Sequence, residues 1–320
     1  MESLNTTRYD FVDEMKGIAI FFVVMGHVIF FSMNNPQKNF CLEWISSFHM
    51  PLFIFISGFL VREIPSFKKL LNKTKKFMLP FLLWGVLWAL YIGSDVKGLA
   101  YETSKYGYWY FVVLTLFYWT LFPLCINTFD TKWKELLYFV FIQAIFLIGK
   151  IQVEPSNDLL SFIHCFNLFP FFVFGYFVRK YYVTTIQKWI GNSSAGGGIF
   201  VMLFVVLTIL LIIFNGFPFS NYIMGISGIL FFLTLCIRDE MNGVLRRLLK
   251  RIGKHTLSIY ALHYFIVWQI NLKYVAELLL GSNNYLLFVT VLILTSAFVI
   301  IVVMCIKNIL AQCRLINDFI

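Results

Sequence analysis

Residues 16–27 read Lys16-GIAIFFVVMG-His27, an apolar run with a cation at one end and an imidazole near the other. The run extends to residue 33, a length suited to crossing a bilayer as a helix. Ionisable side chains are costly inside a bilayer, so one placed there is a functional-site hypothesis by default. Eleven helical residues turn through about 1,100°, which puts Lys16 and His27 on one face, about 16 Å apart along the axis. The two side chains are too far apart to touch, but they could line two ends of one cavity.

Similar apolar runs recur along the 320 residues, which are 60% hydrophobic and only 13% charged. A soluble domain would have about twice that charged share. The composition predicts an all-α, polytopic membrane bundle with no room for a second soluble domain, so we expect residues 1–320 to form a single domain. We predict ten spans, at residues 17–33, 48–61, 77–93, 108–126, 136–149, 159–178, 196–214, 220–237, 255–270 and 285–306.

The distribution of basic residues predicts the orientation of these spans. With the N-terminus in the cytoplasm, the outer segments hold five of the 26 Lys and Arg residues, namely Lys38, Lys97, Lys105, Lys150 and Lys273. Cytoplasmic loops of membrane proteins are enriched in Lys and Arg. We therefore expect both termini in the cytoplasm. The net charge of +10 has a sufficient cause in this bias and requires no nucleic-acid partner.

His27 and Lys16 each admit two interpretations. Imidazole is the side chain best suited to moving protons near neutral pH, although His27 could also be a buried histidine bonded to a neighbouring helix. Lys16 could bind an anion at a helix start, or it could be an interfacial lysine that extends to the headgroups. Membrane depth and the shared helix face favour a function for His27.

Other side chains are weaker candidates. His49 is expected at the start of the second span, with Pro51 in its first turn, and His263 lies within the ninth. The histidines lack the local spacing of a zinc site, so we expect no metal. Trp109 could stack on a sugar or belong to an interfacial aromatic belt. Ser57-Gly58 is more typical of a close helix contact than of a nucleophile.

No Asp or Glu lies within the ten spans as predicted. Ion-coupled transporters often use a membrane carboxylate, so this pattern weighs against that class.

Several stretches together resemble the membrane-bound acyltransferase 3 family. The first is Tyr9-Asp-Phe-Val-Asp-Glu-Met-Lys16 followed by Val24-Met-Gly-His27, with ten residues between the basic residue and the histidine. The second is Ser47-Phe-His-Met-Pro-Leu-Phe-Ile-Phe-Ile-Ser-Gly-Phe-Leu60. Shorter matches occur at Trp109-Tyr-Phe111, Phe169-Pro-Phe-Phe-Val-Phe-Gly-Tyr176 and Ile252-Gly-Lys-His-Thr-Leu-Ser-Ile-Tyr-Ala-Leu-His263. The resemblance is strongest to the fucose 4-O-acetylase-like branch.

Two positions depart from the family pattern. Most of the family has arginine where this chain has Lys16, and lysine keeps the charge but loses the bidentate fork. The family's Arg-x-x-Arg after the second span corresponds here to Lys73-Thr-Lys-Lys76.

The resemblance implies an O-acyltransferase of the bacterial cytoplasmic membrane. Such an enzyme would move an acetyl group from acetyl-CoA to a hydroxyl of a surface glycan or a lipid-linked saccharide. His27 would be the general base, with Lys16 the second catalytic candidate. Lys16, Lys73 and Lys76 would hold the donor phosphates, and His49, Trp109 and His263 would contact the acceptor. Acetyl-CoA is then a co-substrate, and membrane lipids surround the protein.

Two other functions are compatible with the residues themselves. The first is a transporter or flippase of a lipid-linked sugar that uses the same histidine-bearing, aromatic interior. The second is a non-catalytic scaffold of a surface-polysaccharide complex. Transfer of labelled acetyl to a glycan separates the enzyme from both.

Overall fold

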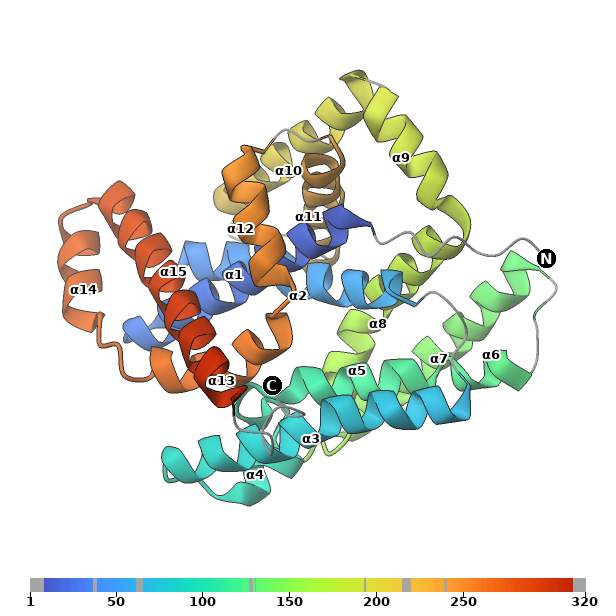
Figure 1. Cartoon of the computed structure of the whole chain (residues 1–320), viewed down its shortest axis with the longest axis horizontal. Helices are drawn as coiled ribbons and strands as arrows, with labels where there is room; N and C mark the ends of the chain where they lie inside the picture. Colours follow the sequence, from blue (N-terminus) through green and yellow to red (C-terminus); the bar gives the residue numbers. More distant parts are fainter. Residues whose placement is uncertain are drawn as a thin grey trace. The chain divides into compact units, whose positions relative to one another are not determined.

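In the computed structural model, the described residues are 9–36, 39–61, 66–126, 129, 131–192, 194–214, 220–238 and 241–312. Within these ranges the regular structure is helical, apart from an isolated bridge between Glu154 and Asn157 (Figure 1). The structure confirms the all-α class. Each of the ten predicted spans overlaps at least one helix, and the span at 108–126 overlaps two.

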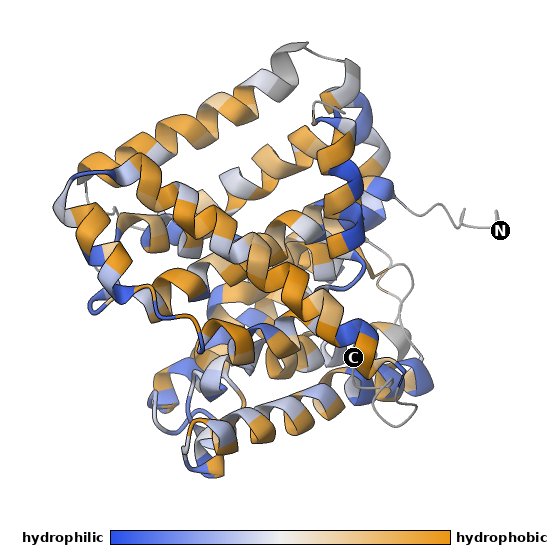
Figure 2. Ribbon diagram, turned by 60° about the vertical axis from the view of Figure 1, so that its left-hand side comes forward, coloured by the Kyte–Doolittle hydropathy of each residue, from blue (hydrophilic) through white to orange (hydrophobic). Residues whose placement is uncertain are grey.

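Six helical segments are long and apolar enough to cross a membrane, fewer than the ten predicted. They are α1 (Asp10–Ser32), α2 (Phe40–Phe59), α7 (Lys132–Gln152), the continuous helical stretch Phe162–Gly191, α11 (Ser220–Ile237) and α15 (Tyr285–Leu310). Apolar residues dominate the long helices (Figure 2). Shorter apolar helices lie at Trp109–Leu124, Gly198–Ile213 and Thr256–Val267. The count of ten and the cytoplasmic termini remain predictions.

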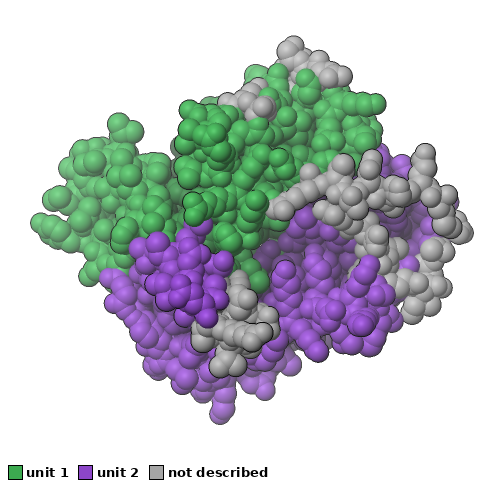
Figure 3. All heavy atoms as spheres, viewed as in Figure 1, with its two compact units in different colours: residues 1–56, 183–260, 270–301 green, residues 57–182, 261–269, 302–320 purple. Residues whose placement is uncertain are grey.

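The chain divides into two compact units, which Figure 3 distinguishes by colour. Unit 1 comprises residues 1–56, 183–260 and 270–301, and unit 2 comprises residues 57–182, 261–269 and 302–320. Three of the boundaries fall within α2, α13 (Thr256–Val267) and α15, and the other two lie between residues 182 and 183 and between residues 269 and 270. The prediction of a single domain is not tested by this division.

Unit 1 contains α1, most of α2 and the helices that follow residue 182. Those helices are α9 (Val183–Asn192), α10 (Ser194–Phe214), α11, α12 (Gly243–Gly253), α14 (Lys273–Gly281), the start of α13 and most of α15. Its core includes an aromatic cluster contributed by α1, α2, α10 and α11, formed by Phe22, Trp44, Phe48, Phe204 and Phe232. Ring pairs of this kind add to the stabilisation from apolar burial.

Two helices of unit 1 begin earlier than the sequence suggests. Helix α1 begins at Asp10 because Asp10 and Asp13 occupy its first turn, where carboxylates offset the partial positive charge of a helix N-terminus. Helix α2 begins at Phe40, so Pro51 lies in the helix interior and the prediction that Pro51 occupies the first turn is wrong. Proline has no N–H to donate to the carbonyl one turn earlier.

Unit 2 contains the end of α13, the end of α15 and the helices between residues 57 and 182. The helices in that range are α3 (Phe67–Tyr91), α4 (Val96–Tyr101), η2 (Lys105–Gly107), α5 (Trp109–Trp119), α6 (Phe122–Ile126), α7, α8 (Phe162–Phe177) and the π-helical turn η3 (Val178–Tyr182). Gly58 permits a close contact, because a Cβ there would lie 2.0 Å from the carbonyl oxygen of Phe172 on α8. The close-packing interpretation of Ser57-Gly58 therefore holds.

The turn before α5 is held by a buried lysine. Lys105 is 1% exposed and donates hydrogen bonds from Nζ to the carbonyl oxygens of Ala100 (2.5 Å) and Asp158 (2.9 Å). The Asp158 carboxylate accepts from the backbone N–H groups of Phe162 and Ile163 at the start of α8. Lys105 thus ties the segment before α5 to the segment before α8. Burial lowers the pKa of the Lys105 ammonium to about 8.

Candidate active site

Helix α1 carries both leading candidates, Lys16 and His27, without an interruption between them. This continuity confirms the condition on which the shared-face argument depends. The two residues therefore lie on one side of the helix, separated by about 16 Å along its axis. Both side chains are partly exposed.

Lys16 forms an ion pair within its own helix. Its Nζ lies 3.2 Å from Oδ1 of Asp13, one turn earlier, and its side chain is 21% exposed. Because a neighbouring carboxylate already partners the ammonium, an anion that approaches Lys16 competes with Asp13. The interfacial interpretation of Lys16 therefore has to account for a polar partner within the protein.

Two further acidic residues of α1 pair with α12. Glu14 is fully buried, and its Oε1 accepts hydrogen bonds from Arg246 Nη2 (2.9 Å) and Nε (3.1 Å). Lys250 Nζ lies 2.9 Å from Asp10 Oδ2 and 3.4 Å from Glu14 Oε1. A buried carboxylate needs such partners, since an unpaired buried charge is strongly destabilising. Sequence reasoning assigned Arg246 and Lys250 to the positive-inside bias and missed these pairs.

The two helices meet at backbone distance around these ion pairs. A Cβ on Gly17 would lie 2.2 Å from the carbonyl oxygen of Leu249, and one on Gly253 would lie 1.8 Å from that of Asp13. No larger residue fits at either position without a shift of the backbone. The turn of α1 that carries Lys16 is therefore fixed against α12.

His49 on α2 is held by its own helix. Its Nδ1 lies 2.7 Å from the carbonyl oxygen of Ile45. A carbonyl oxygen can only accept, so Nδ1 carries the hydrogen and Nε2 of the neutral ring is a hydrogen-bond acceptor. This is the tautomer that can accept a proton from a hydroxyl group.

The segments of α1 and α2 that bear His27 and His49 pack against each other within unit 1. A Cβ on Gly26, the residue before His27, would lie 3.6 Å from Cγ2 of Ile45. Ile45 also supplies the carbonyl that His49 contacts. The structure thus brings the His27 segment to the helix turn that orients His49.

Unit 2 holds the other sequence-predicted residues. The rings of Trp109 and His164 stack with centroids 4.0 Å apart and planes 15° apart. His263 is fully buried, with its ring centroid 4.2 Å from that of Tyr264, a setting that favours a packing role. Contact of His263 with a substrate remains a prediction. Its stacking on Trp109 makes His164 a further candidate for the site.

The two predicted phosphate-binding lysines of unit 2 lie on α3. Lys73 Nζ is 4.6 Å from the centroid of the Tyr118 ring, a cation–π contact. Lys76 is exposed. The Tyr118 hydroxyl donates to the carbonyl oxygen of Ser57 at 3.2 Å. Lys73 therefore lies over an aromatic ring that is anchored to α2.

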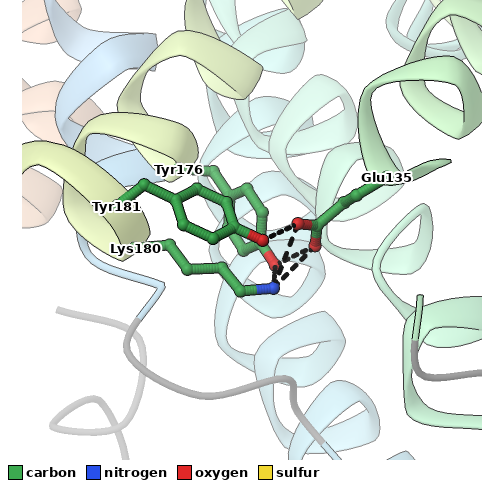
Figure 4. Close-up of polar contacts among 4 residues, drawn as sticks. All are labelled: Glu135, Tyr176, Lys180 and Tyr181. Carbon is green, nitrogen blue, oxygen red and sulfur yellow. Dashed lines mark hydrogen bonds and ion pairs between the residues drawn. The ribbon is translucent and has the colours of Figure 1, made fainter. Parts of the chain in front are cut away.

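Figure 4 shows a buried carboxylate that sequence reasoning missed. Glu135, 2% exposed, accepts hydrogen bonds from the hydroxyls of Tyr176 (2.6 Å) and Tyr181 (2.5 Å) and from Lys180 Nζ (2.9 and 3.1 Å). Glu135 lies in α7, a candidate membrane span that begins at Lys132, before the predicted boundary at residue 136. The spans as predicted contain no carboxylate, but the longer candidate spans of the structure do, Glu14 of α1 among them.

The π-helical turn η3 explains why both tyrosines reach Glu135. Tyr176 and Lys180 are four residues apart, and Tyr181 is five residues from Tyr176. A π-turn has more residues per turn than an α-helix, so it brings residues i, i+4 and i+5 toward one side. The polar cluster joins α7 to α8 and η3 within unit 2.

Comparison with known proteins identifies the family. A family model described as an acyltransferase domain matches residues 9–306, nearly the whole chain. The chain belongs to the acyltransferase 3 family. It is therefore an acyltransferase, and its apolar helices make it a membrane protein. Neither a search among curated proteins nor one among solved structures finds a match.

The matched residues include parts of both units. Lys16, His27 and His49 belong to unit 1, whereas Lys73, Lys76, Trp109 and His263 belong to unit 2. Among the described residues, no group of three or more His, Cys, Asp or Glu side chains could hold a metal ion. The expected absence of metal remains a prediction.

Proposed function

We propose that this acyltransferase moves an acetyl group from acetyl-CoA to a hydroxyl of a surface glycan or a lipid-linked saccharide. The observation that carries the proposal is the position of Lys16 and His27 on one face of the uninterrupted helix α1. A separation of about 16 Å is comparable to the reach of an extended pantetheine arm. Lys16, which binds the donor phosphates, is therefore separated along the helix from His27, which acts at the thioester, rather than paired with it.

His27 acts as the general base in this proposal. Its imidazole takes the proton of the acceptor hydroxyl as the oxygen attacks the thioester carbonyl, and an ester C–O bond forms while the C–S bond breaks. The proton then passes from the imidazolium to the departing thiolate, which leaves as coenzyme A. One imidazole returns to its starting state in each cycle, so the transfer needs no further co-reactant.

In this proposal, lysine side chains bind the donor. Lys16 exchanges its Asp13 partner for a phosphate of the donor, and Lys73 and Lys76 supply further positive charge. A phosphate carries more charge than one carboxylate and offers more acceptor oxygens, which favours the exchange.

In the same proposal, His49 and Trp109 bind the acceptor, and His263 is a weaker candidate for this role. The Nε2 lone pair of His49 accepts a hydrogen bond from a sugar hydroxyl. The indole of Trp109, already stacked on one face by His164, offers its other face to a pyranose ring. We assign the protein to the cytoplasmic membrane of a bacterium with both termini in the cytoplasm, and to the fucose 4-O-acetylase-like branch.

Membership in an acyltransferase family disfavours the transporter alternative. If the protein were instead a non-catalytic scaffold, replacing His27 would leave glycan acetylation unchanged. Mass spectrometry of surface glycans, from cells with and without the gene, tests the proposal. We expect one added acetyl mass per modified unit when the wild-type gene is present, and none with His27→Ala. Full acetylation with His27→Ala would overturn the proposal.

A further inference from the structure

Helix α12 presents three different surfaces. One faces α1, where Leu249 and Gly253 are buried and where Arg246 and Lys250 form the ion pairs with Glu14 and Asp10. Because of the backbone contacts at Gly17 and Gly253, this surface is fully occupied. The other two surfaces of α12 face away from α1.

The second surface is apolar and exposed. Val244, Leu245 and Leu248 are 54%, 47% and 52% exposed. Residues three and four apart are neighbours on a helix, so these three side chains form one continuous patch. Apolar side chains gathered on one side of a short helix are typical of a surface that meets lipid or a partner.

The third surface is basic and lies beside the apolar patch. Arg247 and Arg251, four residues apart, are exposed, and Lys254 follows just after the helix. Among the residues that the structure describes, no carboxylate forms an ion pair with these three side chains. The basic residues of α12 thus fall into two sets, one neutralised by α1 and one that retains its positive charge at the surface.

The place where α12 packs along α1 indicates which kind of partner the exposed surfaces of α12 bind. The charged residues of α1 are confined to its first turns, from Asp10 to Lys16, and an apolar run follows. The polar end of a spanning helix lies at the membrane surface. Since α12 packs against that polar end, its apolar patch and its arginines lie where acyl chains meet headgroups. A helix with apolar and basic sides at this level is typical of an interfacial helix.

We propose that α12 is a binding surface for anionic phospholipid headgroups, with Val244, Leu245 and Leu248 in the acyl boundary and Arg247, Arg251 and Lys254 on the phosphates. Guanidinium groups match phosphate oxygens bidentately, and basic residues at a membrane surface attract anionic lipids. The inference does not depend on the acyl donor or acceptor.

The test compares lipid retention by the full chain. The protein is purified in detergent from vesicles that contain phosphatidylcholine and phosphatidylglycerol in equal parts, and retained lipids are counted by native mass spectrometry. We expect wild type to retain phosphatidylglycerol over phosphatidylcholine. Arg247→Gln/Arg251→Gln should lose about tenfold or more of that preference. Arg247→Lys/Arg251→Lys should keep most of it.

Two controls decide between this site and other causes. Lys68→Gln/Lys75→Gln removes the same charge from exposed positions on α3 and should leave the preference unchanged. An equal loss in both double variants would show a general charge effect and overturn the proposal. Displacement of phosphatidylglycerol by saturating acetyl-CoA would also overturn it, because the arginines would then bind the soluble donor.

Discussion

Arg246 on α12 directs two of its nitrogens at a single carboxylate oxygen of Glu14 on α1, and the Glu14 side chain is fully buried. Lys250 contacts the same oxygen at 3.4 Å. The charge of Glu14 is thus balanced by residues more than two hundred positions away in sequence. This pair fixes the end of α1 that carries Lys16.

Removal of Arg246 should therefore destabilise unit 1. We expect Arg246→Leu to lower the free energy of unfolding by about 3 kcal/mol, near the lower end for a broken buried pair because Lys250 remains. Adding Glu14→Gln should recover part of the loss, since the uncompensated charge is then gone. Thermal unfolding in detergent measures both effects. The exposed neighbour Arg247→Leu is the matched control, and an equal loss there would contradict the role of the pair.

Lys16 should affect donor binding rather than the chemical step. Lys16→Gln is expected to raise the KM for acetyl-CoA by about tenfold or more, through loss of a charge-assisted hydrogen bond. Asp13→Asn should lower that KM, because the carboxylate that competes with phosphate is removed. Initial rates at varied donor concentration test both signs. Donor KM values that do not move in either variant would rule out phosphate binding at Lys16.

Trp109 should act on the acceptor alone. We expect Trp109→Ala to raise the KM for the acceptor saccharide by about three- to tenfold, the size of one lost stacking contact, with the donor KM unchanged. Trp109→Phe should retain part of the affinity. Trp133→Ala is a matched control, since Trp133 is 73% exposed on α7. Equal acceptor KM values in wild type and Trp109→Ala would remove Trp109 from the site.

Lys105 should make a contribution to the free energy of unfolding that rises with pH. Burial lowers the pKa of the Lys105 ammonium to about 8 in the folded chain, from its ordinary value of 10.5. Between these two values the unfolded chain binds more protons, so the contribution of Lys105 to stability rises with pH across that window. Lys105→Met should lack this rise. Unfolding free energies from about pH 8 to 10 test the difference, and parallel pH profiles for the two proteins would contradict the assignment.

The helical class was predictable because apolar runs are local features of the sequence, whereas the roles of Lys16 and His27 remain predictions. The run after Lys16 predicted a continuous helix, and α1 is continuous through His27. Helix starts were less predictable. Residues such as Glu135 lie in an amphipathic first turn, and the hydropathy of the following residues does not mark that turn as part of the helix.

Long-range polar pairs were not predictable from local pattern. The pairing of Glu14 with Arg246 depends on which helices pack together. Neither the residues around Glu14 nor those around Arg246 identify the partner helix. One signal was present: Asp10, Asp13 and Glu14 form an acidic group immediately before an apolar run. Carboxylates in that position need cations, and α12 supplies them to Asp10 and Glu14, whereas Asp13 pairs with Lys16 of its own helix. The stacking of His164 on Trp109 was hidden for the same reason.

The central claim is that His27 is the base for acyl transfer, and purified protein in lipid vesicles tests it most directly. The vesicles receive acetyl-CoA labelled in the acetyl group together with a saccharide acceptor, and label on the saccharide is counted over time. The account predicts steady transfer by wild type and a fall of at least about a hundredfold for His27→Gln, with unchanged thermal unfolding. Transfer by His27→Gln at the wild-type rate would contradict it.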